Sequence, residues 1–327
     1  MSQTVDIREL NERIESKSGF VNMIFMGMDQ MIVGQKHLVE SLLIGLLSDG
    51  HILLEGVPGL AKTLAIKTLA SLIDAQYSRI QFTPDLLPAD LIGTMIYSQK
   101  KEEFLVKHGP VFANFILADE INRAPAKVQS ALLEAMQERQ VTIGERTYKL
   151  PEPFLVMATQ NPIEQEGTYP LPEAQQDRFM FNIWLDYPTF QEEVDIVKST
   201  IHGDMQEPRQ ILSIEEIVFY QKLLQKVPIP DNVYQYAVKV SASTRPNTER
   251  AHAWANEYLS WGAGPRASQF LIIGARTHAI LKGKYSPDIE DVKSVAHNIL
   301  RHRIIKNYKA EAENITVENI IDELLKA

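Results

Sequence analysis

Residues 51–63 read His51-Ile-Leu-Leu-Glu-Gly56-Val-Pro-Gly-Leu-Ala-Lys62-Thr63. The apolar run at 51–55 predicts a short buried strand, and the glycines after it predict a tight turn. Lys62 and Thr63 then open a stretch with apolar residues at helical spacing. A strand, a glycine-rich loop and a helix in this order predict a phosphate-binding loop, in which backbone N–H groups and the helix N-terminus face phosphate oxygens.

Two side chains of the loop at 56–63 are expected to contact the ligand directly. Lys62 is expected to contact the β- and γ-phosphates of ATP, and Thr63 to offer its hydroxyl to magnesium. The alternative is a plain strand-to-helix turn with an exposed lysine, but a lysine in the first turn of a helix opposes the helix dipole. The residues expected to bind the nucleotide here are Gly56, Val57, Pro58, Gly59, Leu60, Ala61, Lys62, Thr63 and Leu64.

Polar residues also follow the apolar runs at 115–118 and 154–158. Asp119 and Glu120 end the first run, and because successive strand side chains point to opposite sides, the two acids can divide the work. Asp119 is expected to hold magnesium, mostly through water, and Glu120 to activate the attacking water as a general base. Asn161 follows the second run and is a candidate to orient that water. Acids at a strand end and an Asn-Pro turn are also common in plain loops, and the phosphate loop upstream favours the catalytic interpretation.

Apolar runs separated by helical patterns predict an α/β fold with a parallel sheet covered on both faces. These runs lie at 51–55, 77–82, 115–118, 154–158 and 179–185. Polar segments at 94–109 and 140–150 predict two additional hairpins. Helical patterns dominate after Tyr187-Pro188, so we expect a nucleotide-binding domain over residues 1–190 and a linker with a helical domain over residues 191–327.

Composition excludes several classes of function. The 327 residues contain no cysteine and carry a net charge of -9, which removes thiolate chemistry and argues against a general nucleic-acid binder. Basic residues outnumber acids within 239–309, which indicates a solvated helical face or a surface for phosphates or an acidic neighbour. No stretch has the length of a membrane helix, and residues 1–22 lack the apolar core of a secretory signal. We therefore expect a cytoplasmic protein with no membrane segment.

Four motifs, in this order, resemble the AAA+ superfamily and within it the MoxR family. They are the loop at 56–63, Ala118-Asp-Glu-Ile-Asn-Arg-Ala-Pro125, Ala158-Thr-Gln-Asn-Pro162 and Glu173-Ala-Gln-Gln-Asp-Arg-Phe179. The likeness extends over about the whole chain, from Val33 onward. Ala61 stands where glycine usually precedes the lysine, and this family usually carries alanine there. Asp119 and Glu120 match the Walker B acids, and Asn161 matches sensor 1.

The resemblance implies an AAA+ P-loop core with a parallel sheet flanked by helices, plus a C-terminal all-helical lid domain. It implies an ATPase with ATP and Mg²⁺ as cofactors, assembled as a homo-oligomeric ring, commonly a hexamer. Gly34 and Gln35 look like the segment that lines the adenine pocket. Arg178 looks like the arginine finger given to a neighbouring subunit, and Arg266 looks like sensor 2, acting in cis or in trans. The two predicted hairpins resemble the helix-2 and pre-sensor insertions.

Members of this family act as chaperone-like factors in complex assembly, maturation and metal-cofactor insertion, often with a partner that carries a von Willebrand factor A domain. The resemblance therefore implies remodelling of a protein client. An alternative is a nucleic-acid-stimulated AAA+ motor, against which the acidic net charge and the lack of an aromatic-basic stripe argue. Another is a nucleotide-dependent scaffold with little turnover, which the presence of Glu120, Asn161 and Arg178 disfavours.

Overall fold

The computed structural model describes residues 19–56, 62–161, 167–202 and 209–326. The chain divides into two compact units, which are described separately. The N-terminal unit contains residues 22–179 and 183–219, and the described part of the C-terminal unit contains residues 19–21, 180–182 and the chain from 220 onward. Residues 183–219 thus cluster with the N-terminal unit, and the domain boundary placed after residue 190 stays a prediction.

A five-stranded sheet with strand order β2-β5-β8-β1-β9 forms the centre of the N-terminal unit. Its strands are β1 (Ile52–Gly56), β2 (Tyr77–Gln81), β5 (Phe115–Asp119), β8 (Leu155–Gln160) and β9 (Phe181–Leu185). β2 pairs with β5, β5 with β8 and β8 with β1, all in parallel. Each apolar run of the sequence forms one of these strands, which confirms the predicted α/β fold.

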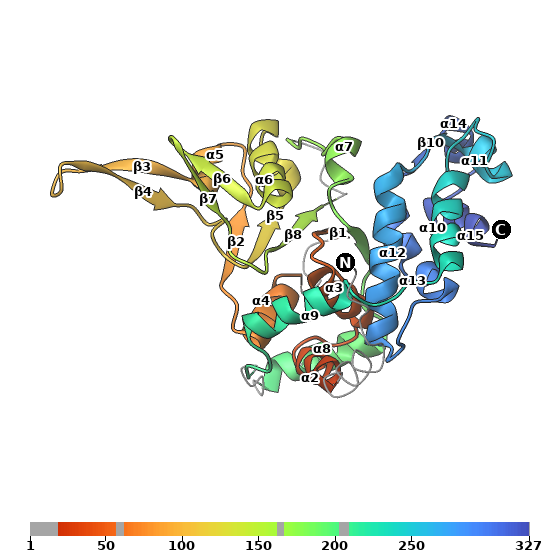
Figure 1. The fold of residues 1–327 in the computed structure, drawn as a ribbon, viewed down its shortest axis with the longest axis horizontal. Helices are drawn as coiled ribbons and strands as arrows, with labels where there is room; N and C mark the ends of the chain where they lie inside the picture. The colour runs from red at the N-terminus through yellow and green to blue at the C-terminus, as the bar shows by residue number, and fades with distance from the viewer. Residues whose placement is uncertain (1–18, 57–61, 162–166, 203–208, 327) are drawn as a thin grey trace, which may run out of the picture. The chain divides into compact units, whose positions relative to one another are not determined.

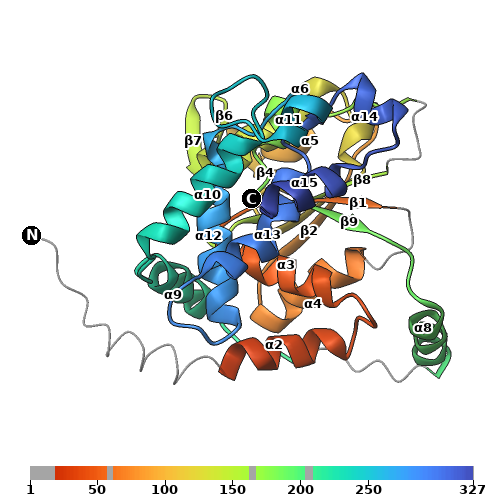
Figure 2. The same cartoon turned by 90° about the vertical axis from the view of Figure 1, so that its right-hand side faces the viewer.

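Helices cover both faces of this sheet, as Figures 1 and 2 show. α3 (Lys36–Leu47) and α4 (Lys62–Ile73) lie on one side, and α6 (Ala126–Glu138) lies on the other. A Cβ added to Gly45 of α3 would come within 2.6 Å of Ile52 Cδ1, so α3 packs tightly onto β1. The other helices that the structure describes before residue 225 are α2 (Gly19–Asp29), α5 (Pro88–Ile92), η1 (Ile121–Arg123), α7 (Glu173–Gln176), α8 (Phe190–His202) and α9 (Ile214–Leu224).

The two faces of the strands build two layers of core, because side chains alternate along a strand. Leu53, Ile116 and Val156 from three strands pack in one buried cluster with Leu132 and Met136 of α6. The intervening residues are also fully buried; they are Ile52, Leu54, Leu117, Leu155 and Met157. A strand covered on both faces has no polar side, which explains why these runs read as continuously apolar.

Two antiparallel hairpins extend this unit. β3 (Gly93–Ser98) pairs with β4 (Glu103–His108), and β6 (Gln140–Ile143) pairs with β7 (Arg146–Lys149). Both hairpins were predicted from the sequence at 94–109 and 140–150, and the pairing confirms them.

Helices dominate the C-terminal unit. They are α10 (Asp231–Ser243), α11 (Ala253–Tyr258), α12 (Pro265–Leu281), α13 (Ile289–Leu300), α14 (Tyr308–Ala312) and α15 (Val317–Leu325). The prediction of helices alone needs one addition, a short antiparallel sheet of β10 (Leu259–Trp261) and β11 (Ile305–Lys306). Among the residues that the structure describes, no helix has the length and apolarity needed to cross a membrane.

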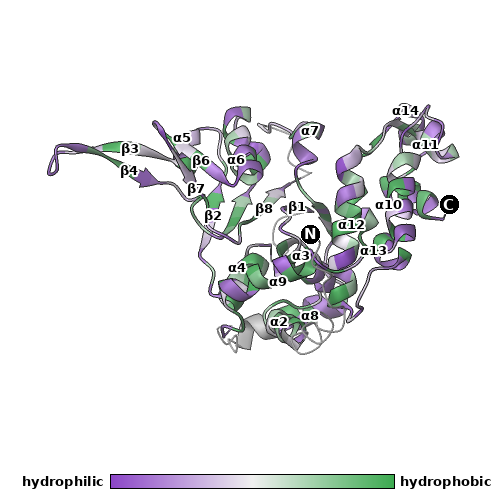
Figure 3. Ribbon diagram, viewed as in Figure 1, coloured by the Kyte–Doolittle hydropathy of each residue, from purple (hydrophilic) through white to green (hydrophobic). Residues whose placement is uncertain are grey.

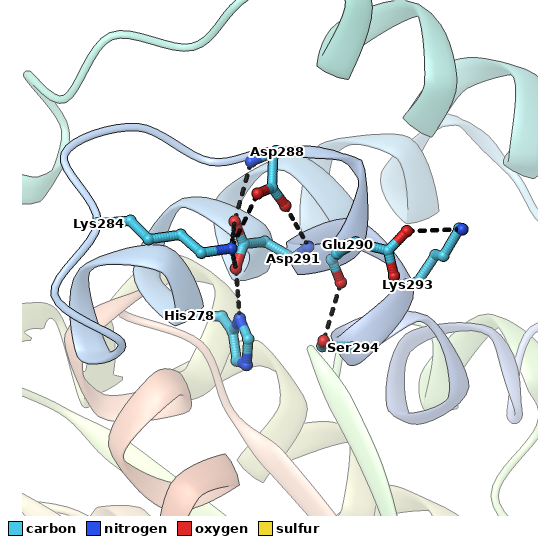
Figure 4. Close-up of polar contacts among 7 residues, drawn as sticks. All are labelled: His278, Lys284, Asp288, Glu290, Asp291, Lys293 and Ser294. Atoms are coloured by element: carbon cyan, nitrogen blue, oxygen red, sulfur yellow. Dashed lines mark hydrogen bonds and ion pairs between the residues drawn. The ribbon is translucent and has the colours of Figure 1, made fainter.

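Asp291 fastens the start of α13 to the end of α12 (Figure 4). Its fully buried carboxylate accepts hydrogen bonds from His278 Nδ1 at 2.8 Å and from Lys284 Nζ at 3.1 Å. The backbone N–H of Asp288 also donates to it at 2.9 Å, and Asp288 Oδ1 accepts from the backbone N–H of Asp291 at 3.1 Å. This reciprocal capping satisfies the buried acid and fixes the helix start.

His51, just before β1, is a buried histidine whose tautomer is set by its two hydrogen-bond partners. The backbone N–H of Val156 donates to Nδ1 at 3.0 Å, so Nε2 carries the proton and donates to the carbonyl of Met136 at 3.2 Å. Burial lowers the pKa of His51 well below its ordinary value of 6.5, and the charge of Arg139 lowers it further. The folded chain therefore resists a proton that the unfolded chain accepts.

We expect the free energy of unfolding to decrease as the pH falls below 6.5, because only the unfolded chain then protonates His51. The loss approaches about 1.4 kcal/mol per pH unit until the pH reaches the folded pKa. His51→Gln does not titrate and can keep both hydrogen bonds, so its unfolding free energy should depend less on pH. Urea unfolding between about pH 5 and pH 8 measures both proteins. Equal pH slopes would show that His51 titrates freely in the folded state.

Candidate active site

The predicted site residues of the N-terminal unit gather where the parallel strands end. In the register, Gln81 lies opposite Asp119, Ala118 opposite Ala158, and Leu54 opposite Thr159. The carboxyl ends of β2, β5, β8 and β1 therefore meet at one edge of the sheet, the usual place for a ligand in an open α/β sheet. This edge is visible above α4 in Figure 1.

Gly56 and Lys62 flank the phosphate loop. Gly56 ends β1, and a Cβ there would come within 2.7 Å of the carbonyl oxygen of Leu185, so the position has no room for a side chain. Lys62 begins α4 and donates from Nζ to the carbonyl oxygen of Gly56 at 2.5 Å. Thr63 and Leu64 follow it, half-buried, in the first turn. The remaining predicted loop residues, which lie outside the described residues, are Val57, Pro58, Gly59, Leu60 and Ala61.

The environment of Lys62 contains the predicted acids. Partial burial lowers the pKa of the Lys62 ammonium, and the charges of Asp119, Glu120 and Glu55 raise it in opposition. The ammonium therefore lies close enough to the three carboxylates to interact with their charge. A lysine in this position can meet phosphate oxygens in front of the helix N-terminus.

Thr159 holds the two acids together, although the sequence pointed to it only as part of a polar strand end. Its hydroxyl donates to Asp119 Oδ1 at 2.7 Å and accepts from the backbone N–H of Glu120 at 2.8 Å. The side chain is buried, with 2% of its surface exposed. One hydroxyl therefore fixes both the carboxylate of Asp119 and the backbone of Glu120.

The sequence predicted that alternation along the strand would point Asp119 and Glu120 to opposite sides. This was wrong for Glu120, because it lies outside the strand. β5 ends at Asp119, and Glu120 has φ 57° and ψ 50°, in the left-handed region that non-glycine residues adopt rarely. Its Oε2 accepts from Gln81 Nε2 at 2.8 Å and forms an ion pair with Arg123 Nε at 3.0 Å. Gln81 and Arg123 thus hold the carboxylate of Glu120 in place.

Arg79 and Gln81 complete this network and were not predicted. Arg79 donates from Nη2 and Nε to Asp119 Oδ2 at 2.6 and 3.1 Å. Both residues lie on β2, two positions apart, and therefore on one face of the strand. Two polar side chains two positions apart in a predicted strand were the available signal in the sequence.

Asn161 and Arg178 lie in different surroundings. Asn161 is buried directly after β8. Arg178 follows α7 and lines a hollow of about 510 Å³. The other residues of this hollow are Ser130, Leu133, Glu134, Gln137, Glu138, Gln140 and Gln175. The residues that line this hollow do not include Lys62, Asp119 or Glu120. Within the described part of the unit, Arg178 therefore lies apart from these three residues.

Gly34, Gln35 and Arg266 are the remaining residues predicted to contact the nucleotide, and they lie far from the motifs above in the sequence. Gly34 has φ 81°, and a Cβ there would come within 2.4 Å of the Glu192 side chain at the start of α8. Gln35 follows and precedes α3 as its N-cap. Arg266 lies in the first turn of α12 in the C-terminal unit, after Pro265. Its role toward a nucleotide stays a prediction.

Comparisons with known proteins find relatives over nearly the whole chain. The sequence model of the ATPase family associated with various cellular activities (AAA) matches residues 51–181, and that of the AAA lid domain matches residues 251–324. The chain is 50% identical over 297 residues to Chaperone MoxR1 of Mycobacterium tuberculosis, with 91% of this chain and 78% of that protein covered. It is 40% identical over 300 residues to the uncharacterized protein YeaC of Bacillus subtilis, with 91% of each covered. A crystal structure from Cytophaga hutchinsonii, described as a "putative ATPase", has a TM-score of 0.91 and 47% identity, with 98% of both chains covered.

We expect Thr159→Val to lower the free energy of unfolding by about 1–3 kcal/mol, because it leaves the backbone N–H of Glu120 and one oxygen of Asp119 without their partner. ATP hydrolysis should decrease with it, since both acids lose their fixed position. Thr159→Ser keeps the hydroxyl and is the matched control, which should retain most of the activity. Urea unfolding and a phosphate-release assay measure the two effects. A Thr159→Val protein as stable and as active as the wild type would contradict the assignment.

Proposed function

We infer that this chain, which belongs to the MoxR family of AAA+ ATPases, couples ATP hydrolysis to the remodelling of a protein client. The family membership makes nucleotide binding and ATP hydrolysis its activity. The relative from Mycobacterium tuberculosis is named a chaperone, and this name supports the client-directed part of the proposal.

The observation that carries the site assignment is the meeting of Lys62, Asp119 and Glu120 at one sheet edge. In the proposed mechanism Lys62 exchanges the carbonyl oxygen of Gly56 for the β- and γ-phosphates of ATP. Glu120 accepts the proton of the attacking water, and Asn161 orients that water. Gly34 and Gln35 line the adenine, and the loop at 57–61 surrounds the phosphates through its N–H groups.

The donor set at the sheet edge fits magnesium. Asp119 offers a carboxylate oxygen and Thr63 a hydroxyl, and Mg²⁺ prefers such hard oxygen ligands together with substrate phosphates. Oδ2 of Asp119 already faces a cation, the guanidinium of Arg79, at 2.6 Å, so the carboxylate is placed to receive positive charge. When bound, the metal would neutralise charge that develops on the phosphates. We propose Thr63 and Asp119 as its protein ligands.

Assembly into a homo-oligomeric ring, as a hexamer, completes the proposed site. Among the described residues, none assigned to the nucleotide lines the hollow around Arg178, which is consistent with an arginine that acts on a neighbour. Arg178 would stabilise charge on the γ-phosphate bound by the next subunit. Arg266, in the first turn of α12, would contact a phosphate as sensor 2.

The β3–β4 hairpin offers a surface for a protein client. Met95, Ile96, Tyr97 and Phe104 are exposed by 41%, 45%, 54% and 64%, and Figure 3 shows the corresponding hydrophobic segments. Neighbouring exposed apolar side chains of this kind commonly mark a protein contact. We propose that the hairpin contacts the client. We also propose that the ring works together with a partner protein that carries a von Willebrand factor A domain.

Glu120→Gln should keep ATP binding and lose hydrolysis, because the amide is nearly isosteric but a poor base. The expected decrease is about 10²–10⁴-fold. Titration calorimetry measures the binding, and phosphate release measures the turnover. Glu215→Gln, at an exposed position of α9, is the matched control and should hydrolyse ATP normally. Turnover of Glu120→Gln within a few-fold of the wild type would remove Glu120 as the base.

Arg178→Ala should also bind ATP and lose hydrolysis, by about 10³–10⁵-fold if it behaves as arginine fingers do elsewhere. Lys62→Ala should lose ATP binding, because no charge then faces the phosphates. Mixing the two inactive proteins should restore partial activity, since some interfaces then pair an intact phosphate loop with an intact arginine.

Subunit exchange between the two variants is verified separately, for example with two fluorescent labels. If subunits exchange and no activity returns, the assignment of Arg178 to a neighbour is wrong. If Arg178→Ala alone hydrolyses ATP normally, the residue is structural.

A further inference from the structure

The proposed function assigns magnesium to a carboxylate oxygen of Asp119, and in the structure Arg79 contacts this carboxylate. Its Nη2 and Nε both donate to Oδ2 of Asp119, at 2.6 and 3.1 Å. The other oxygen, Oδ1, accepts the hydroxyl proton of Thr159 at 2.7 Å. A divalent cation bound at Oδ2, directly or through one of its water ligands, would lie against the two N–H groups of Arg79, so the two cations compete for the same oxygen.

The two partners of Asp119 differ in how readily they can leave. Thr159 has 2% of its surface exposed, whereas the side chain of Arg79 is 51% exposed. An ion pair with an exposed arginine contributes little to stability and can open into water at a small cost. The buried hydroxyl meanwhile keeps the carboxylate in place, so Oδ2 can change its partner while the carboxylate stays where it is.

Arg79 is also linked to the proposed base. Its Nη2 donates to Gln81 Oε1 at 3.1 Å, and Gln81 Nε2 donates to Glu120 Oε2 at 2.8 Å. The same oxygen of Glu120 forms the ion pair with Arg123 at 3.0 Å. A continuous set of contacts therefore runs from the cation on Asp119 to the carboxylate that activates water. Departure of Arg79 removes the contact that orients the Gln81 amide.

We propose that Arg79 is a positioning residue that stands in for the magnesium ion on Asp119 until the metal–nucleotide complex replaces it. This inference rests on the proposed function, which assigns the metal to Asp119. The exchange has one consequence. Without nucleotide the protein binds a divalent cation weakly, because the arginine must first leave.

The test is a titration of nucleotide-free protein with Mn²⁺, whose free ion is measured by electron paramagnetic resonance. Arg79→Gln should bind Mn²⁺ about fivefold or more tightly than the wild type, because no cation competes for Oδ2. Arg146→Gln on β7 removes the same charge from an exposed position away from Asp119 and should match the wild type. Adding Asp119→Asn to Arg79→Gln should abolish the gain.

An unchanged Mn²⁺ affinity in Arg79→Gln would overturn the inference, as would a gain that survives Asp119→Asn or one that Arg146→Gln shares. Arg79→Met keeps the aliphatic stem and replaces Arg79→Gln if that variant misfolds. Binding of a fluorescent ATP analogue at saturating Mg²⁺ separates the two proposals. If the wild type binds no ATP, the proposed function is wrong; if it binds ATP and the Mn²⁺ affinities are equal, only the role of Arg79 is wrong.

Discussion

The hydroxyl of Thr159 is the contact on which the geometry of the acid pair depends. It reaches both Asp119 and Glu120 only because β5 and β8 run parallel with Ala118 opposite Ala158. A shift of one residue in this register would turn the Thr159 side chain to the other face of the sheet. The two-layer core prevents such a shift, since it would also move buried apolar residues to the wrong layer. Core packing thus fixes the positions of the two acids.

Most of the fold could be predicted from the sequence because its inner strands β1, β5 and β8 are buried on both faces and read as separate apolar runs. The hairpins were predictable as well, since their signal is local alternation around a turn. The β10–β11 sheet was not, because Leu259–Trp261 pairs with a segment more than forty residues away that has only two residues, Ile305 and Lys306. A pairing between such short and distant segments leaves no periodicity in either one.

The candidate site also contains residues that local motifs predict and residues that they do not. Lys62, Asp119 and Glu120 belong to local motifs, and the sequence predicted that they lie at the end of a strand or the start of a helix, as Lys62 and Asp119 do. Arg79 and Gln81 act through the pairing of β2 with β5, which a local pattern does not contain. The left-handed turn at Glu120 was also missed, because its backbone is held by a side chain from another strand.

Each group assigned to the ligand has a partner within the chain that the ligand can replace. Lys62 donates to the Gly56 carbonyl, Asp119 accepts from Arg79, and Glu120 accepts from Gln81. An unpaired charge in a half-buried site would be costly, so these contacts keep the site stable before ATP arrives. Binding then replaces one partner by another of the same charge or polarity. Because the side chain of Arg79 is 51% exposed, its place on Asp119 can be exchanged at a small cost.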